Sequence, residues 1–107
     1  MSAPLSPQAF NASFTEAKRL HFEGHFDRAR HIYQDIAARN PAESAPHMML
    51  AELDMRDGRL VTARKRLEAV IEQHPQLKAP RRALAGLAEE LADAPVALAL
   101  YRQEVDE

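Results

Sequence analysis

Histidines and carboxylates are the side chains of this sequence with the clearest potential for chemistry. His21 and His25 are four residues apart, with Asp27 and His31 close behind. Imidazole and carboxylate groups are common ligands of metal ions. The spacing crosses Gly24, however, and a glycine that ends a helix separates the faces on which the two imidazoles lie. We therefore interpret these histidines as solvated surface residues and expect no metal site.

Catalytic arrangements are not indicated by the remaining polar residues. Glu89 and Glu90 are neighbours and diverge by about 100° on a helix, so they do not form an acid/base dyad. The chain has no cysteine, which excludes a disulfide scaffold, a thiolate zinc site and a catalytic thiol. It also lacks a nucleophile elbow, a phosphate-binding loop and an HExxH motif. We expect a protein that is not an enzyme and needs no cofactor.

The composition is that of one globular domain. The 107 residues are 46% hydrophobic, which is enough to form a core. No run of about 18 apolar residues is present, and the first residues lack the basic and apolar segments of a signal peptide, so we expect a soluble, cytoplasmic protein without membrane insertion. A formal net charge of −2 argues against binding to nucleic acid.

A constant period, equal to the separation of Gly24 and Gly58, organises the chain. The recurring positions carry glycine, alanine, proline and leucine, and they share this one offset. They are Gly24 and Gly58, Ala29, Ala63 and Ala97, Pro41 and Pro75, Pro46 and Pro80, and Leu50 and Leu84.

The recurring residues are those that start and stop helices. Glycine accepts the left-handed conformation that follows many helices, and proline ends one helix or opens the next. The pattern predicts helices at about 7–22, 26–39, 45–57, 60–73 and 79–91, and a sixth that begins near Asp93. Its apolar positions on the first helix are Phe10, Phe14, Ala17, Leu20 and Phe22. No segment alternates with period two, so no sheet is expected.

The repeated residues resemble those of the tetratricopeptide repeat (TPR) family, whose unit is a helix-turn-helix of about 34 residues. Ala17, Ala51 and Ala85 match the small residue of the first helix, beside the turn glycines and closing prolines. The resemblance implies an all-α, right-handed α-solenoid of three repeats and six helices in one domain. A lead over 1–9 would precede repeats at 10–43, 44–77 and 78–107, the last incomplete.

The same resemblance implies a protein-interaction module that holds a peptide or helix in a concave groove lined by the first helix of each repeat. The clamp by which some members hold acidic chain ends is absent, because Phe14, Met49, Ala79 and Ala83 stand at four of its five positions. The residues that the resemblance places in the groove are Asn11, Phe14, Lys18, His21, Phe22, Met48, Glu52, Met55, Arg56, Arg82 and Glu89.

Two features leave alternatives open. Residues 56–82 carry a net charge of +5 and residues 83–107 a net charge of −5, which could orient a partner. The last predicted helix also presents Leu98, Leu100, Tyr101 and Val105, although the end of a solenoid is normally polar. A homodimer or self-associating scaffold formed through these residues is one alternative. The other is an N-terminal docking domain of a larger enzyme such as a transferase.

Overall fold

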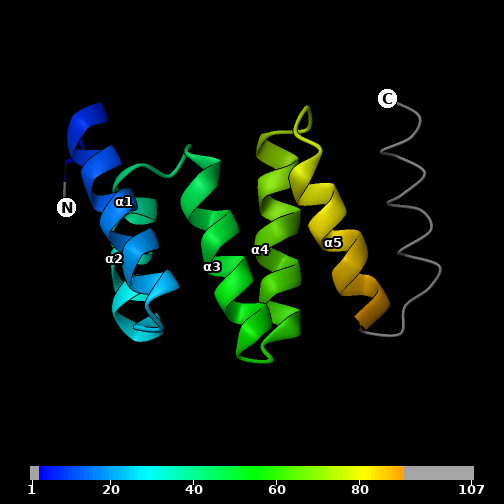
Figure 1. The fold of residues 1–107 in the computed structure, drawn as a ribbon. Coiled ribbons are helices and arrows are strands. Elements are labelled where there is room, and N and C mark those ends of the chain that lie inside the picture. The colour runs from blue at the N-terminus through cyan, green and yellow to red at the C-terminus, as the bar shows by residue number, and fades with distance from the viewer. Residues whose placement is uncertain (1–2, 91–107) are drawn as a thin grey trace. The chain divides into compact units, whose positions relative to one another are not determined.

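A computed structural model describes residues 3–90 and contains five α-helices and no strand within them. The helices are α1 (Pro7–Phe22), α2 (Phe26–Arg39), α3 (Ser44–Arg56), α4 (Leu60–Gln73) and α5 (Ala79–Glu90), in the order shown in Figure 1. The predicted bounds of α1, α2 and α4 are confirmed, and those of α3 differ by one residue at each end; α5 begins as predicted, and its predicted end at residue 91 lies outside the described residues. We expected six helices; the sixth, with Leu98, Leu100, Tyr101 and Val105, lies outside the described residues.

The chain divides into two compact units, Met1–Leu53 and Asp54–Glu107. In the first unit, α1 and α2 run antiparallel and pack against each other (Figure 1). In the second unit, α4 and α5 do the same. Neighbouring helices therefore pack within each unit; α1 and α2 belong to one predicted repeat, whereas α4 and α5 belong to successive ones.

Glycines in the left-handed conformation end α1 and α3. Gly24 has φ 86° and Gly58 has φ 77°. After α1, the N–H of His25 donates to the carbonyl of Leu20 at 2.8 Å, and the N–H of Gly24 donates to His21 at 3.2 Å. The same two bonds recur after α3, from Arg59 to Asp54 and from Gly58 to Met55. This pair of bonds is the Schellman motif, which favours glycine because a Cβ is strained at positive φ.

The core of the first unit is formed by α1, α2 and the part of α3 that precedes Asp54. Its buried side chains are Ala17, Leu20, Ala29, Tyr33, Ile36, Ala37, Leu50 and Leu53. Alanines at the helix contacts are fully buried, which allows the helices to approach closely. Tyr33 is the largest of the fully buried side chains, so an aromatic ring lies at the centre of this unit.

The segment that precedes α1 is fixed to the end of α2. The carboxamide of Asn40 accepts a hydrogen bond from the N–H of Leu5 at 2.9 Å and donates one to the carbonyl of Leu5 at 3.2 Å. Arg39 Nε donates to the carbonyl of Ala3 at 2.9 Å, and the Leu5 side chain packs against the core. The hydroxyl of Ser6 then caps α1 by accepting from the N–H of Ala9. Residues 3–6 are thus an ordered strap.

A charged pair lies inside the second unit. Asp54 is only 1% exposed, and its carboxylate accepts a hydrogen bond from Arg66 Nε of α4 at 3.1 Å. The buried apolar residues around α4 and α5 are Ala63, Leu67, Val70, Leu84, Ala85 and Leu87. Among the described residues, this unit therefore combines aliphatic side chains with an ion pair whose carboxylate is buried.

Helices long and apolar enough to cross a bilayer are absent from the part of the chain that the structure describes.

Candidate functional site

A row of aromatic rings follows one side of α1. Phe10 and Phe14 lie one turn apart, with ring centroids separated by 6.0 Å and planes inclined by 15°. The Phe14 ring also contacts Tyr33 of α2, with centroids 5.8 Å apart. Both phenylalanines are half-buried against the core of the first unit. Ring pairs of this geometry contribute about 0.5–1.5 kcal/mol beyond area burial, so the row is held in place while part of it faces solvent.

Tyr33 lies at the base of this row. Its hydroxyl oxygen is 3.4 Å from His21 Nδ1, and the two rings meet edge to face at 6.1 Å. Burial raises the pKa of Tyr33 to about 12, and the negative charge of Glu52 on α3 adds to the shift. Glu52 is exposed, so its carboxylate stands at the solvent side of the same cluster.

His21 extends the row to the end of α1. Its ring contacts Phe26 edge to face at 5.8 Å and stacks on Phe22 at 6.2 Å. The rings thus form a continuous set, which we call the aromatic face. Its members are Phe10, Phe14, His21, Phe22, Phe26 and Tyr33.

A cation covers part of the aromatic face. Lys18 Nζ lies 5.7 Å from the centroid of the Phe14 ring, within the range of a cation–π interaction. Lys18 itself is exposed, so its ammonium group remains available to solvent or to a ligand. The face therefore combines apolar rings with a positive charge on α1 and the negative charge of Glu52 on α3.

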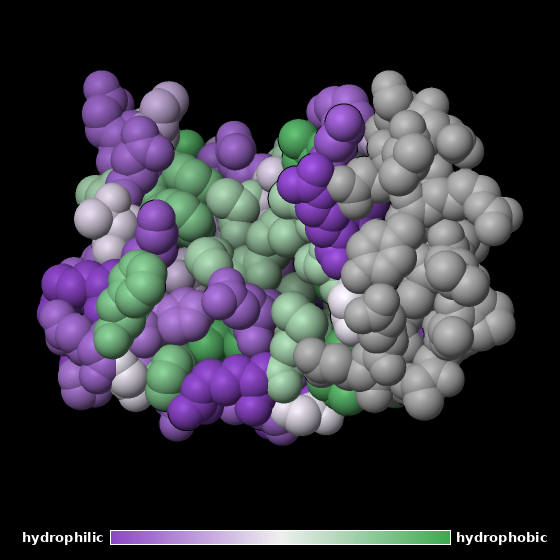
Figure 2. Space-filling view, turned by 45° about the vertical axis from the view of Figure 1, so that its right-hand side comes forward, coloured by the Kyte–Doolittle hydropathy of each residue, from purple (hydrophilic) through white to green (hydrophobic). Residues whose placement is uncertain are grey.

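Phe22, which we expected both among the apolar positions of α1 and in the groove, is exposed. It is the last residue of α1, where the chain turns at Gly24, and 86% of its surface is accessible. Exposed apolar surface among hydrophilic side chains is also visible on the face of the molecule drawn in Figure 2. A large exposed aromatic ring is costly in water, and such rings are enriched where proteins bind one another.

The predicted groove residues divide between the two units. Phe14, Lys18, His21 and Phe22 lie together on α1, and Glu52 is close to Tyr33. Asn11 is exposed on α1, and Met48 is half-buried on α3. Met55, Arg56 and Arg82 belong to the second unit, and Glu89 is at the end of α5, where no side chain is described.

Sequence reasoning missed two residues that lie beside the aromatic face. Phe10 was considered only as an apolar position of the first helix, and Met49 only as a departure from the acidic-peptide clamp. In the structure Met49, like Phe10, packs against the core without being fully buried. The spacing of four residues between Phe10 and Phe14 was the available signal, because residues four apart share a helix face.

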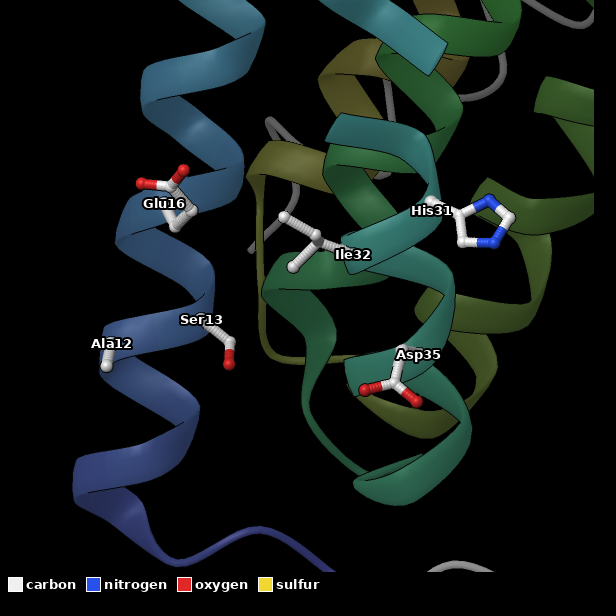
Figure 3. Close-up of a pocket in the computed structure, with 6 residues that line it drawn as sticks. All are labelled: Ala12, Ser13, Glu16, His31, Ile32 and Asp35. Atoms are coloured by element: carbon white, nitrogen blue, oxygen red, sulfur yellow. The ribbon is translucent and has the colours of Figure 1, made fainter. Parts of the chain in front are cut away.

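A groove lies on the other side of α1, since Glu16 is about 200° around the helix from Phe14. Two pockets with volumes of about 410 and 440 Å³ share Glu16, His31 and Ile32. In Figure 3, Ser13 and Ile32 point toward the space between the helices, whereas His31 points to the outer side of α2. We call this surface the α1–α2 groove; it is lined by Ala12, Ser13, Glu16, Leu20, Asp27, Arg28, His31, Ile32 and Asp35.

Two carboxylates of the α1–α2 groove are paired with arginines. Glu16 accepts from Arg19 Nε at 2.9 Å, and this hydrogen bond lowers the pKa of Glu16. Asp35 lies 3.7 Å from Arg39. Both carboxylates are therefore engaged in ion pairs within their own helices.

The histidines considered as metal ligands have other surroundings. His21 belongs to the aromatic face, and His25 Nε2 lies 3.9 Å from the carboxylate of Glu23. Within residues 3–90, no group of three or more histidines and carboxylates is placed to hold a metal ion.

Helix-turn-helix units that recur with a period of about 34 residues define a helical repeat protein. The profile of the tetratricopeptide repeat family matches residues 22–89, and the chain belongs to that family. No curated protein matches the sequence.

Two solved structures share the fold. "MamA RS-1 ArsTM double mutant" superimposes with a TM-score of 0.81 at 16% identity and covers 94% of this chain and 56% of that chain. A structure of MamA AMB-1 gives a TM-score of 0.77 at 17% identity, over 94% of this chain and 59% of that chain. The present chain thus spans less than two thirds of either structure.

Proposed function

We propose that this protein is a non-enzymatic interaction module that binds a peptide or a helix of another protein. The proposed architecture is a right-handed solenoid of three repeats, at 10–43, 44–77 and 78–107. The proposed binding surface is lined by the first helix of each repeat. Membership of a family built from such repeats supports the proposal, since repeat proteins use extended surfaces of this kind to bind partners.

One observation carries the proposal. The aromatic face leaves Phe22 almost fully exposed and Phe14 half-buried, at positions that the family pattern assigns to the ligand. The corresponding residues of repeat two are Arg56 and Met48. A helix-turn-helix pair, which we call a hairpin, therefore does not require aromatic rings at these two positions. A ligand that covers the Phe14 and Phe22 rings would remove their apolar surface from water.

The test compares two exposed apolar residues. Phe22→Glu places a charge on the aromatic face, and Val61→Glu places one at a 60% exposed position of α4. Neither change disturbs a buried side chain, so both variants should keep the helical circular dichroism of the parent protein. Proteins captured from a lysate of the source cells by the parent and by each variant would be identified by mass spectrometry.

We expect Phe22→Glu to lose the specific partner and Val61→Glu to retain it. A buried charge facing an apolar anchor costs at least about 2 kcal/mol, or a loss of more than tenfold in affinity. Equal recovery by Phe22→Glu and the parent protein would reject the aromatic face as the binding surface.

Self-association is a second proposal, and it rests on the sequence of the last repeat. Leu100 and Ala88 occupy the positions that Arg66 and Asp54 occupy in the preceding repeat, so apolar residues replace the ion pair of the second unit. Sedimentation equilibrium of the parent protein and of Leu98→Lys with Leu100→Lys tests it. A mass of one chain for both proteins would exclude a homodimer through this helix.

A further inference from the structure

The phenylalanines of the chain are concentrated in the first unit. All four phenylalanines of the chain belong to the aromatic face, together with Tyr33 and His21. In the second unit, the side chains buried among the described residues are mostly aliphatic. Counterparts of Phe10, Phe14 and Tyr33 in the next repeat are Ser44, Met48 and Leu67. The face is therefore a specialised feature of this hairpin, and its charges should indicate what it binds.

Lys18 supplies the positive charge of this surface. Its ammonium group lies over the Phe14 ring, and no carboxylate within residues 3–90 forms a salt bridge with it. Arg19 and Arg39, on the same hairpin, are each paired with a carboxylate of their own helix. Lys18 is thus a cation of this hairpin that retains its full capacity to pair with an incoming anion beside an apolar ring.

Glu52 limits what that anion can be. It is the counterpart of Lys18 in the second repeat, and its charge reaches Tyr33 at the base of the same surface. A nucleic-acid strand presents a negative charge at every nucleotide, so its backbone would be repelled by Glu52 while pairing with Lys18. A polypeptide can place a single carboxylate at Lys18 and a neutral or basic residue near Glu52. The charges favour a peptide.

We propose that the aromatic face recognises a polypeptide segment with an apolar anchor side chain and an acidic residue beside it. The anchor packs on Phe14 and Phe22, and the carboxylate pairs with Lys18 above the Phe14 ring. This inference rests on the proposed function and specifies the chemistry of the partner.

A library of displayed random dodecapeptides is the probe. It would be selected in parallel on the parent protein, on Lys18→Glu and on Lys65→Glu, which makes the same change at an exposed residue of α4. We expect peptides from the parent protein and from Lys65→Glu to contain Asp or Glu beside an apolar residue. Lys18→Glu should select Lys or Arg at that position. Synthetic peptides from the parent selection should bind Lys18→Glu about tenfold more weakly than the parent protein.

The outcomes separate the two proposals. Peptides that lose binding to Phe22→Glu but show no acidic preference would overturn the inference and leave the interaction module intact. Peptides whose acidic preference is unchanged by Lys18→Glu would overturn it as well. Failure to enrich any peptide on the parent protein would count against both proposals. Tighter binding of a single-stranded oligothymidylate than of any peptide would replace the inferred partner by nucleic acid.

Discussion

The strap that precedes α1 offers a direct test of how the first unit is held together. The perturbation is Asn40→Ala, which removes both hydrogen bonds between the Asn40 carboxamide and the backbone of Leu5. The main chain at Asn40 has φ −130° and ψ 67°, and His74 adopts nearly the same angles, −132° and 65°, after α4, so the conformation does not require asparagine and the side-chain contacts are the principal loss.

The magnitude follows from the geometry. At 2.9 and 3.2 Å both bonds are within the normal range, and each contributes about 0.5–1.5 kcal/mol net. Their loss should destabilise the protein by about 2 kcal/mol. For a domain of this size that corresponds to a decrease in Tm on the order of 10 °C. The Leu5 side chain, which packs against the core, should be released at the same time.

Urea unfolding followed by circular dichroism measures the free energy, and hydrogen exchange measures the protection of the Leu5 amide. Asn11→Ala is the matched control, because Asn11 is exposed on α1 and alanine favours the helix. The control should be neutral or slightly stabilising. If the free energy of unfolding of Asn40→Ala lies within about 0.5 kcal/mol of the parent value, the range of an ordinary surface substitution, the strap is not fixed as the structure shows. Unchanged exchange at the Leu5 amide would lead to the same conclusion.

Three further predictions concern other sites. Gly24→Ala should lower the free energy of unfolding by about 1 kcal/mol because φ is 86°, whereas Gly86→Ala within α5 should raise it; urea unfolding measures both. The opposite order would show that Gly24 is not in the left-handed conformation. The raised pKa of Tyr33 stabilises the fold below pH 10, and this contribution to the free energy of unfolding should disappear as pH rises toward 12. In an absorbance titration of tyrosine ionisation, the step near pH 12 should be absent from Tyr33→Phe. Arg66→Ala removes one hydrogen bond to the buried Asp54 carboxylate and should cost about 1.5–3 kcal/mol, a loss that thermal unfolding would reveal.

Helix positions were predictable from the sequence because their signals are local. Pro7 opens α1, and Gly24 and Gly58 adopt the positive φ expected of residues that follow a helix. Each signal depends on one residue and its immediate neighbours, so it needs no knowledge of the rest of the fold. The common period then linked these local signals into repeats.

Contacts between distant residues were not predictable in this way. The sequence does not reveal that the Asn40 carboxamide bonds the N–H and carbonyl of Leu5, because nearly every residue has these backbone groups. From the sequence alone, Asp54 and Arg66 have the character of solvated surface charges. Only the folded chain shows that α4 brings Arg66 Nε to the carboxylate of Asp54. The exposure of Phe22 has a similar origin: its position at the last turn of α1 places it beyond the helices that cover its neighbours.

For the candidate site, the residue types were predictable but their combination was not. The family pattern assigned Phe14, Lys18, His21 and Phe22 to one surface, and they do lie on one side of α1. It gave no reason to add Tyr33, which joins Phe14 to His21 from the neighbouring helix. The cation–π contact of Lys18 likewise depends on side-chain direction, which spacing alone does not fix.

The ion pair of the second unit makes the repeats non-interchangeable. Asp54 and Arg66 occupy the repeat positions that Leu20 and Ile32 hold in the first unit, where this apolar pair lines the α1–α2 groove. Exchanging α2 and α4 would bring an isoleucine against a buried carboxylate in one hairpin and an arginine against a buried leucine in the other. Both mismatches should lower stability, because the first removes the arginine that donates to a buried carboxylate and the second places a charged group beside a buried leucine. Duplication or shuffling of these units would therefore succeed only when whole hairpins move together, so the hairpin, rather than the helix, is the unit by which such a chain can be lengthened.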